Sequence, residues 1–479
     1  MKEKGIKLNN DVESLMGLVI VLLAEIKKRD EIIEKQGKEI RLLRAEVEQL
    51  KKRLNKNSKN SHKPPSSDPY RKAATPRKRG GKRGGKVGHK GKGLERLSST
   101  EVIEVKVEAD RCECGEDLTQ VIADIAEVRQ VQDIPKTPVR VTDYVQQKKS
   151  CPCCGKKHLG KFPKGVSASV QYGNNLKVLC VLLCNDYKIP IKRVSQLIED
   201  LYGLVPNVAT ILNYNAKAYE QMESPERQIK ESILSSPVVH SDETGWRVAG
   251  GCNWLHVAST DMFTYLFSHK NRGLEALKSE LSLIKDYMGK LVHDSYASYF
   301  KISNTTHALC GAHIIRELTA QEESGRKWAV KMKRFLLRLN EKEAKENAKN
   351  KDDLLKEYRK ILSNGKKEEP PPERKSKRGK LTKTKGLNLI ERLETRMNAV
   401  LRYAFDPEVP FTNNQAERDF RFAKVKMNVS HCFRSTTGAK YYARIMSVIS
   451  TARKHNMNIF DTLKSTFEDE PIYFANSGS

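Results

Sequence analysis

The chain has 479 residues, and its 88 Lys and Arg outnumber its 59 Asp and Glu to give a formal net charge of +29 at pH 7. This length has room for about three ordinary domains, and the excess of positive charge predicts a large polyanionic partner, with nucleic acid first. The longest apolar stretch, residues 15–26, is too short to span a membrane and lacks the pattern of a signal peptide, so we expect a cytoplasmic, nucleoid-associated protein with no membrane contact.

A heptad pattern of apolar residues runs through residues 12–54. Apolar side chains recur at alternating spacings of three and four residues, and only Arg29 and Gln36 interrupt this seam. The pattern predicts a coiled-coil helix, within a segment 1–56, that joins two or more copies of the chain. The alternative, an amphipathic helix packed on its own domain, is disfavoured because the flanks of the seam are charged and no partner helix follows.

The next segment, 57–100, is polar, rich in Gly, Pro, Lys and Arg, and too poor in apolar residues to fold alone. Between Arg71 and Arg96 it carries eleven basic residues and one acidic residue. The segment is a solvated linker, a basic arm that follows DNA phosphates, or both. The residues we expect to contact DNA here are Arg77, Lys78, Arg79, Lys82 and Arg83.

Two tight groups of cysteines, each followed by Gly, lie in segment 101–165 and are separated by residues with strand-like alternation. Paired thiolates followed by Gly predict a ribbon-like structural Zn²⁺ site held by Cys112, Cys114, Cys151 and Cys154, with Cys153 not binding. Cys112 departs from the favoured spacing, because it lies one residue closer to Cys114 than Cys151 does to Cys154. Free buried thiols are the alternative.

Segment 166–230 reads as two helices separated by a turn at Gly203, the second opening after Pro206. This order is compatible with a DNA-binding helix-turn-helix. Helical hairpins are common in all classes of protein, so the pattern alone leaves an ordinary helical domain open.

Segments 231–326 and 405–460 are expected to form an α/β core. Three short strands, a helix near residues 273–284, a strand ending at Asp294, a strand near residues 306–310 and a further helix follow the order of a ribonuclease H-like fold. Segment 327–404 is charged and helical, so we interpret it as an insertion, and residues 461–479 as a C-terminal tail.

Two carboxylates are expected to converge at one edge of that sheet. Asp242 and Asp294 each end a strand, and the first and fourth strands of a ribonuclease H-like sheet are neighbours. Carboxylate oxygens suit Mg²⁺ or Mn²⁺, and two such ions about 4 Å apart support phosphodiester chemistry. Glu243 should face the opposite side of its strand, away from the ions.

Glu417 is the best candidate for a third acid. Asn414 and Glu417 also match a helix-capping box, which requires no catalysis, so the local sequence leaves both interpretations open. Arg418 and Arg421 lie close by, one helical turn apart, and are candidate phosphate-binding residues. Asp419 and Glu408 are poorer candidates for the third acid.

Several motifs occur together along the chain, in the order NSKNSHKPPSSD, GHKGKGL, CPCCG, HSDETGWRV, HDSYASY, ALCGAHIIREL and TNNQAERDFR. With these motifs, nearly the whole chain resembles the transposases of the insertion sequence 66 family, which have an Asp-Asp-Glu catalytic triad.

The resemblance implies a bacterial DNA transposase in which Asp242, Asp294 and Glu417 bind the catalytic metal ions. It also implies a zinc-binding segment before the core and small accessory proteins encoded alongside. The partners would be the double-stranded DNA of the element ends and target, and a second copy of the chain. Cys310 and His313 match the family pattern too, and we expect them to pack and orient a strand-helix corner rather than bind metal. The alternatives are a DNA-binding or architectural protein without catalysis, and a hydrolytic nuclease of the same fold.

Overall fold

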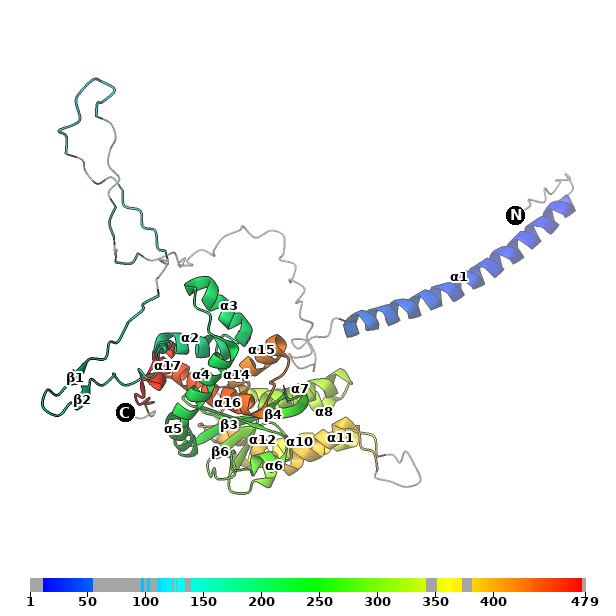
Figure 1. The fold of residues 1–479 in the computed structure, drawn as a ribbon. Helices are drawn as coiled ribbons and strands as arrows, with labels where there is room; N and C mark the ends of the chain where they lie inside the picture. The colour runs from blue at the N-terminus through cyan, green and yellow to red at the C-terminus, as the bar shows by residue number, and fades with distance from the viewer. Residues whose placement is uncertain are drawn as a thin grey trace. The chain divides into compact units, whose positions relative to one another are not determined.

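The computed structural model describes residues 12–54, 96–98, 101–103, 110–122, 125, 127–133, 139–341, 351–372 and 381–475 (Figure 1). The chain divides into two units, one made of Met1–Tyr70, Tyr172–Val194 and Asn207–Ser479 and the other of Arg71–Gln171 and Ser195–Pro206. The predicted DNA-contacting residues of the basic segment, Arg77, Lys78, Arg79, Lys82 and Arg83, lie outside the described residues. None of the described helices is long and apolar enough to cross a membrane.

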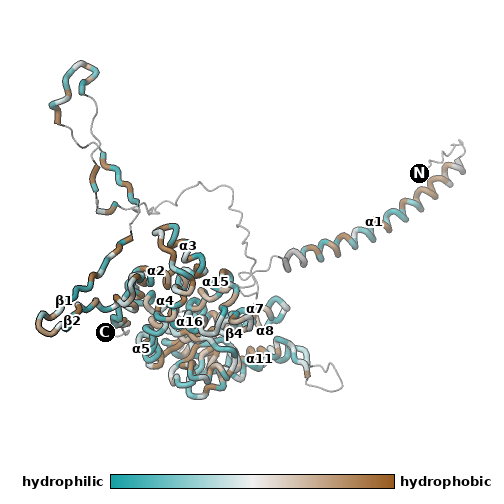
Figure 2. Tube along the Cα trace, viewed as in Figure 1, coloured by the Kyte–Doolittle hydropathy of each residue, from teal (hydrophilic) through white to brown (hydrophobic). Residues whose placement is uncertain are grey.

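Helix α1 spans Val12–Leu54, the same residues over which the heptad pattern runs. Apolar and polar residues alternate along it in Figure 2. Its large apolar side chains are exposed in the single chain, for example Leu22 at 49%, Ile33 at 63% and Leu43 at 54%. An isolated helix with such a seam gains most of its stability by packing against another helix.

A five-stranded mixed sheet forms the centre of the first unit. The strand order is β5-β4-β3-β6-β7, in which β3, β4 and β5 are antiparallel neighbours, β6 is parallel to β3, and β7 is parallel to β6. The strands are β3 (Val238–Val248), β4 (Gly251–Ser259), β5 (Thr264–His269), β6 (Lys290–His293) and β7 (Thr306–Leu309).

The sheet lies between two apolar clusters. On β6, Leu291 belongs to the first cluster and the next residue, Val292, to the second, because successive side chains of a strand point to opposite faces. The helices of the first cluster include α2 (Asn174–Asn185), α4 (Val208–Gln221), α5 (Glu223–Leu234), α16 (Thr436–Lys454) and α17 (Ile459–Glu468). Those of the second are α7 (Gly311–Glu323), α8 (Lys327–Leu339), α10 (Lys351–Glu368), α11 (Lys385–Thr395), α12 (Met397–Val400) and α13 (Arg402–Phe405).

Short elements complete the order of the chain. They are β1 (Lys148–Ser150), β2 (Lys157–Leu159), α3 (Ile191–Tyr202), α6 (Leu274–Leu277), the 3₁₀ helix η2 (Tyr299–Lys301), α14 (Asn414–Asp419) and α15 (Arg421–Ser430). After α3, Gly203 takes a left-handed conformation with φ of +68°, and α4 begins after Asn207, whose side chain accepts the Ala209 N–H at 2.7 Å. The two helices thus occur where the helix-turn-helix pattern placed them, and their contact with DNA stays a prediction.

The predicted end of the first strand at Asp242 is wrong. β3 continues to Val248 because Trp246 and Val248 maintain the alternation of buried side chains and the strand keeps its pairing with β4. A tight turn with positive φ at Ala249 and Gly250 then leads into β4.

Three other sequence expectations differ from the structure. The helix expected near residues 273–284 is limited to the four residues of α6. The expected tail contains most of α17, whose Leu463 and Phe467 are buried in the first cluster. Helices α2, α4 and α5 share that same cluster with the sheet, so the boundary expected at residue 230 does not separate two cores.

Candidate active site

The parallel pairing of β3 and β6 brings Asp242 and Asp294 to one edge of the sheet. The paired residues are Val238 with Lys290, Val239 with Leu291, and His240 with Val292. Asp242 lies two residues beyond the last pair on β3, and Asp294 lies two residues beyond it on β6. The same register carried forward therefore places the two aspartates side by side on the same face, where the strands stop pairing.

Glu417 enters from helix α14, and Asn413 ties the start of that helix to β3. Asn413 is fully buried, donates from Nδ2 to the Ser241 carbonyl at 2.8 Å, and has its Oδ1 2.9 Å from His240 Nδ1. Because Oδ1 can only accept, His240 must donate from Nδ1. The side chain of Asn413, at the N-cap position, makes no capping hydrogen bond in α14. Asn414, the cap residue of the capping box that the sequence left open, is the first residue of α14 instead of its N-cap, so the structure does not form that box. The bond from Asn413 instead ties the start of the helix that carries Glu417 to β3.

The electrostatics of Asp242 show that these acids form one group. Burial raises the pKa of Asp242 well above its usual range, and the negative charges of Glu243, Asp294 and Glu417 raise it further. The Glu243 N–H donates to Asp242 Oδ1 at 2.8 Å and opposes this rise. A bound cation would likewise oppose this rise and stabilise the charged form of Asp242.

Glu243 differs from the other acids, because it has its own partners. Its side chain is 1% exposed; Oε1 accepts from Arg272 Nε at 2.7 Å and Oε2 accepts from the Tyr299 hydroxyl at 2.7 Å. Burial raises the pKa of Glu243, while the bonds from Tyr299 and Arg272 lower it. Arg272 also reaches toward the paired aspartates, with Nη2 4.0 Å from Asp294 Oδ2.

Cys310 and His313 lie at the corner where β7 passes into α7. Cys310 is buried, and its sulfur accepts the Asn413 N–H at 3.2 Å, so it supports the residue that positions Glu417. Burial raises the pKa of Cys310, which disfavours a nucleophilic thiolate. His313 Nδ1 lies 4.0 Å from Glu417 Oε1, and this buried atom has no hydrogen-bond partner within the described part of the chain.

The other acids near Glu417 are engaged in separate contacts. Asp419 accepts from Lys454 Nζ at 2.6 Å and from the Thr264 hydroxyl at 3.0 Å. Glu408 pairs with Lys290 at 2.6 Å, at the far end of β6 from Asp294. Both carboxylates are therefore occupied by other partners. The sequence had likewise made them poorer candidates than Glu417 for the third acid.

The two predicted phosphate-binding arginines beside Glu417 are exposed, but they do not lie on one helix. Arg418 is in α14 and Arg421 begins α15, because the backbone at Phe420 interrupts the helix between them. The expectation that they lie one turn apart on a single helix is therefore wrong.

The donor chemistry of the acid group fits a hard divalent cation. Asp242, Asp294 and Glu417 carry oxygen atoms of the kind that such ions prefer. The pKa of Asp242 is raised first by its burial and then by the negative charges of Glu243, Asp294 and Glu417. As the described residues stand, no three His, Cys, Asp or Glu side chains are gathered closely enough to hold an ion. Ion binding would therefore draw the carboxylates closer together than they are here.

The cysteines of the second unit form two similar turns. The Cys112 N–H donates to the Glu116 carbonyl and the Cys151 N–H to the Lys156 carbonyl, both at 2.9 Å, so the first turn is one residue shorter. Gly115 and Gly155, with φ of +95° and +70°, close the turns in the left-handed conformation that glycine favours.

Amide groups of these turns point at the sulfurs. The Glu116 N–H lowers the pKa of Cys114, and the N–H groups of Cys154 and Cys153 lower the pKa of Cys151. A lower pKa favours the thiolate that binds zinc. Over the described ranges the two cysteine turns do not come together in one metal site. The described strands of this unit are β1 and β2, so the complete zinc ribbon stays a prediction.

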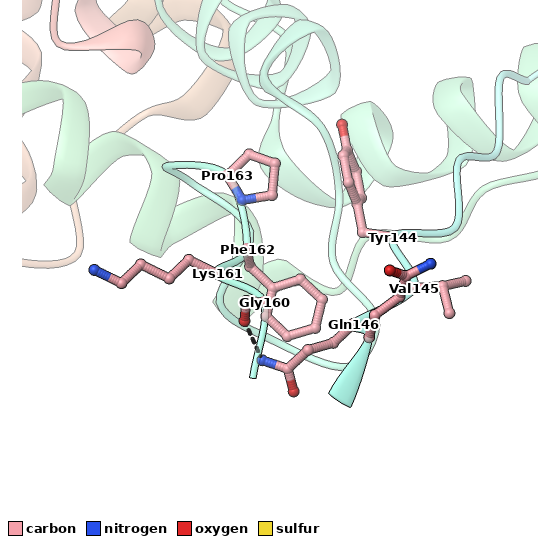
Figure 3. Close-up of a pocket in the computed structure, with 8 residues that line it drawn as sticks. Tyr144, Val145, Gln146, Gly160, Lys161, Phe162 and Pro163 are labelled. Carbon is pink, nitrogen blue, oxygen red and sulfur yellow. Dashed lines mark hydrogen bonds between the residues drawn. The ribbon is translucent and has the colours of Figure 1, made fainter. Parts of the chain in front are cut away.

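A hollow of about 240 Å³ lies beside the β1–β2 hairpin (Figure 3). Residues Tyr144–Gln147 and Gly160–Pro163 line it from two facing segments, and Gln146 Nε2 donates to the Gly160 carbonyl at 2.8 Å. None of its lining residues is an Asp, Glu, His or Cys, so it lacks the side chains that most often bind metal ions.

The sequence pattern did not predict the roles of several residues of the site. Asn413 follows Thr412 in what reads as an ordinary helix start, Arg272 lies in a bend after β5, and Tyr299 begins the short helix η2. Their roles depend on contacts between residues 29 to 173 positions apart, which spacing along the chain does not reveal.

Two family models match the chain. One, described as Transposase IS66 family, matches residues 169–441, which include Asp242, Asp294 and Glu417. The other, described as Family of unknown function (DUF6444), matches residues 21–95. No curated protein matches the chain.

Proposed function

Because the chain belongs to the IS66 family of transposases, we propose that it binds the terminal inverted repeats of an insertion sequence and catalyses metal-dependent cleavage and transfer of their DNA strands. This proposal is supported by the register of β3 and β6, which sets Asp242 beside Asp294, and by the effect of the Asp294 and Glu417 charges on the pKa of Asp242. We further propose that this sheet is a ribonuclease H-like core, which the order β5-β4-β3-β6-β7 supports.

In this proposal the three carboxylates hold Mg²⁺ or Mn²⁺, which when bound supplies the positive charge that phosphodiester chemistry requires at the attacking and leaving oxygens. Asp242 and Asp294 are held by the sheet, and Asn413 holds the helix of Glu417 against β3. The exposed Arg418 and Arg421 bind DNA phosphates beside the acids. The basic segment before residue 100 and helices α3 and α4 add contacts to the terminal repeats.

The proposal is tested with labelled duplexes that end in the inverted repeats flanking the gene, incubated with the protein, Mg²⁺ and plasmid target DNA. We expect a nick at the end of the repeat and covalent joining of its 3′ end to the target. Cleavage without joining would indicate a hydrolytic nuclease. Specific binding without cleavage would indicate a DNA-binding protein that has lost its chemistry.

The paired cysteine turns support a structural Zn²⁺ held by Cys112, Cys114, Cys151 and Cys154. We expect purified protein to contain about one zinc per chain by elemental analysis. Cys151→Ser should lose the metal because it removes a ligand, whereas Cys153→Ser, a change of the same kind in the same turn, should retain it. Zinc-free wild-type protein, or equal zinc in both variants, would contradict the assignment.

The exposed seam of α1 supports a dimer or a higher oligomer, which suits a protein that must hold two DNA ends together. We expect Leu43→Glu, combined with Leu22→Glu, to produce monomers in light scattering, because both residues lie on the heptad seam. Leu42 is 72% exposed and lies just off the seam. Leu42→Glu is therefore the matched control and should remain oligomeric; if the seam variant also does, another surface makes the interface.

A further inference from the structure

Arg272 is held in place on several sides. Its Nε donates to Glu243 Oε1, and its guanidinium lies over two aromatic rings, 4.9 Å from the centroid of Trp254 and 4.4 Å from that of Tyr296. Glu243 is in turn fixed by the Tyr299 hydroxyl. A long side chain held in this way loses little further conformational entropy when it binds a ligand.

The held guanidinium is nevertheless open to solvent and faces the acids. The Arg272 side chain is 39% exposed, and its Nη2 lies 4.0 Å from Asp294 Oδ2, too far for a hydrogen bond. The Nη groups can therefore still donate to an incoming anion. If Arg272 served only to neutralise Glu243, its guanidinium would not need to be exposed to solvent beside Asp294.

The negative charge of the acid group calls for a positive charge that attracts the DNA phosphate, and Arg272 can supply it. Asp242, Glu243, Asp294 and Glu417 place negative charge where a DNA phosphate must approach. A guanidinium binds phosphate through parallel N–H bonds and keeps its charge at any physiological pH.

We propose that Arg272 binds the DNA phosphate that enters the carboxylate site, and that Glu243 and Tyr299 are positioning residues that aim its guanidinium rather than ligands of the metal ions. This inference rests on the proposed function, because it supposes that DNA is cleaved at these acids. It assigns the fourth carboxylate of the group a role separate from that of the other three.

The test compares two end duplexes that differ at a single position. One has an ordinary phosphate at the cleavage position and the other a neutral methylphosphonate. Affinities are measured with Mg²⁺ present in an Asp242→Asn background, which prevents cleavage. We expect Arg272→Gln to weaken binding of the phosphate duplex about tenfold or more, and to leave binding of the methylphosphonate duplex unchanged. Glu243→Gln should show the same selective loss in weaker form, because glutamine keeps an acceptor oxygen for Arg272 Nε but removes the opposite charge that holds the guanidinium.

Two controls separate this role from a structural one. Arg247→Gln, a change of the same kind at an exposed residue of β3, should affect both duplexes equally or not at all. Arg272→Lys keeps the charge opposite Glu243, so it should match the parent in thermal unfolding and recover only part of the phosphate selectivity; it serves in place of Arg272→Gln if that variant unfolds.

If Arg272→Gln lost affinity equally for both duplexes, or lost none, the inference about Arg272 would be wrong. Cleavage of the end duplex by the wild-type protein would still support the proposed transposase function. Wild-type protein that neither cleaves the end duplex nor prefers it to a random duplex would instead refute the proposed function.

Discussion

Replacing Asp242 or Asp294 with Asn is expected to reduce DNA strand cleavage and joining by roughly a thousandfold or more, which corresponds to about 4 kcal/mol of lost transition-state stabilisation. Asn keeps the size of the side chain but removes the charge that holds a divalent ion. Binding of the end duplex should change little, because contacts to phosphates elsewhere dominate affinity. The measurements are single-turnover cleavage of a labelled end duplex and its dissociation constant at one fixed salt concentration.

Asp406→Asn is the matched control for both substitutions. Asp406 pairs with Lys290 at 2.6 Å, at the opposite end of β6 from Asp294, so the same change of charge is made away from the acid group. Its cleavage rate should stay near that of the wild type. If either active-site variant cleaves as fast as this control, the catalytic assignment is wrong.

Local patterns predicted the elements whose stability arises within a short stretch of chain. The heptad spacing matched α1 from its first to its last residue, and short apolar runs located β3, which carries Asp242, and β6, which Asp294 follows. Tertiary packing overrode local patterns elsewhere. The apolar spacing after Leu277 suggested more helix, but Ile284 and Tyr287 are buried in the first cluster from an irregular segment.

The arrangement of the site depended on contacts that no local pattern encodes. The segment around Glu417 satisfied both a capping box with Asn414 and a catalytic acid. In the structure the N-cap is Asn413, and its side chain bonds to β3 instead of to α14. Glu243 was expected to point away from the site because side chains alternate along a strand. Glu243 is nevertheless linked to the site, because it binds Arg272 and the guanidinium of Arg272 approaches Asp294.

Asn413→Ala is expected to lower both the stability and the activity of the protein. The change leaves two buried groups, the Ser241 carbonyl and His240 Nδ1, without the partner they have now, at about 1–3 kcal/mol each. The free energy of unfolding should therefore fall by roughly 2–6 kcal/mol. This loss should appear as a lower midpoint of thermal unfolding.

Cleavage should fall further than the loss of folded protein explains. The Glu417 N–H donates to the Asn413 carbonyl at 3.4 Å, so freeing residue 413 from β3 frees the helical turn that presents the carboxylate. A misplacement of about 1 Å costs on the order of a hundredfold in rate. Cleavage is therefore measured well below the unfolding midpoint, and Asn414→Ala, which removes the same amide from an exposed neighbour, provides the reference. If Asn413→Ala lost stability but cleaved at the rate of Asn414→Ala, the position of Glu417 would not depend on this link, and α14 would be held to the sheet by its apolar contacts through Ala416 instead.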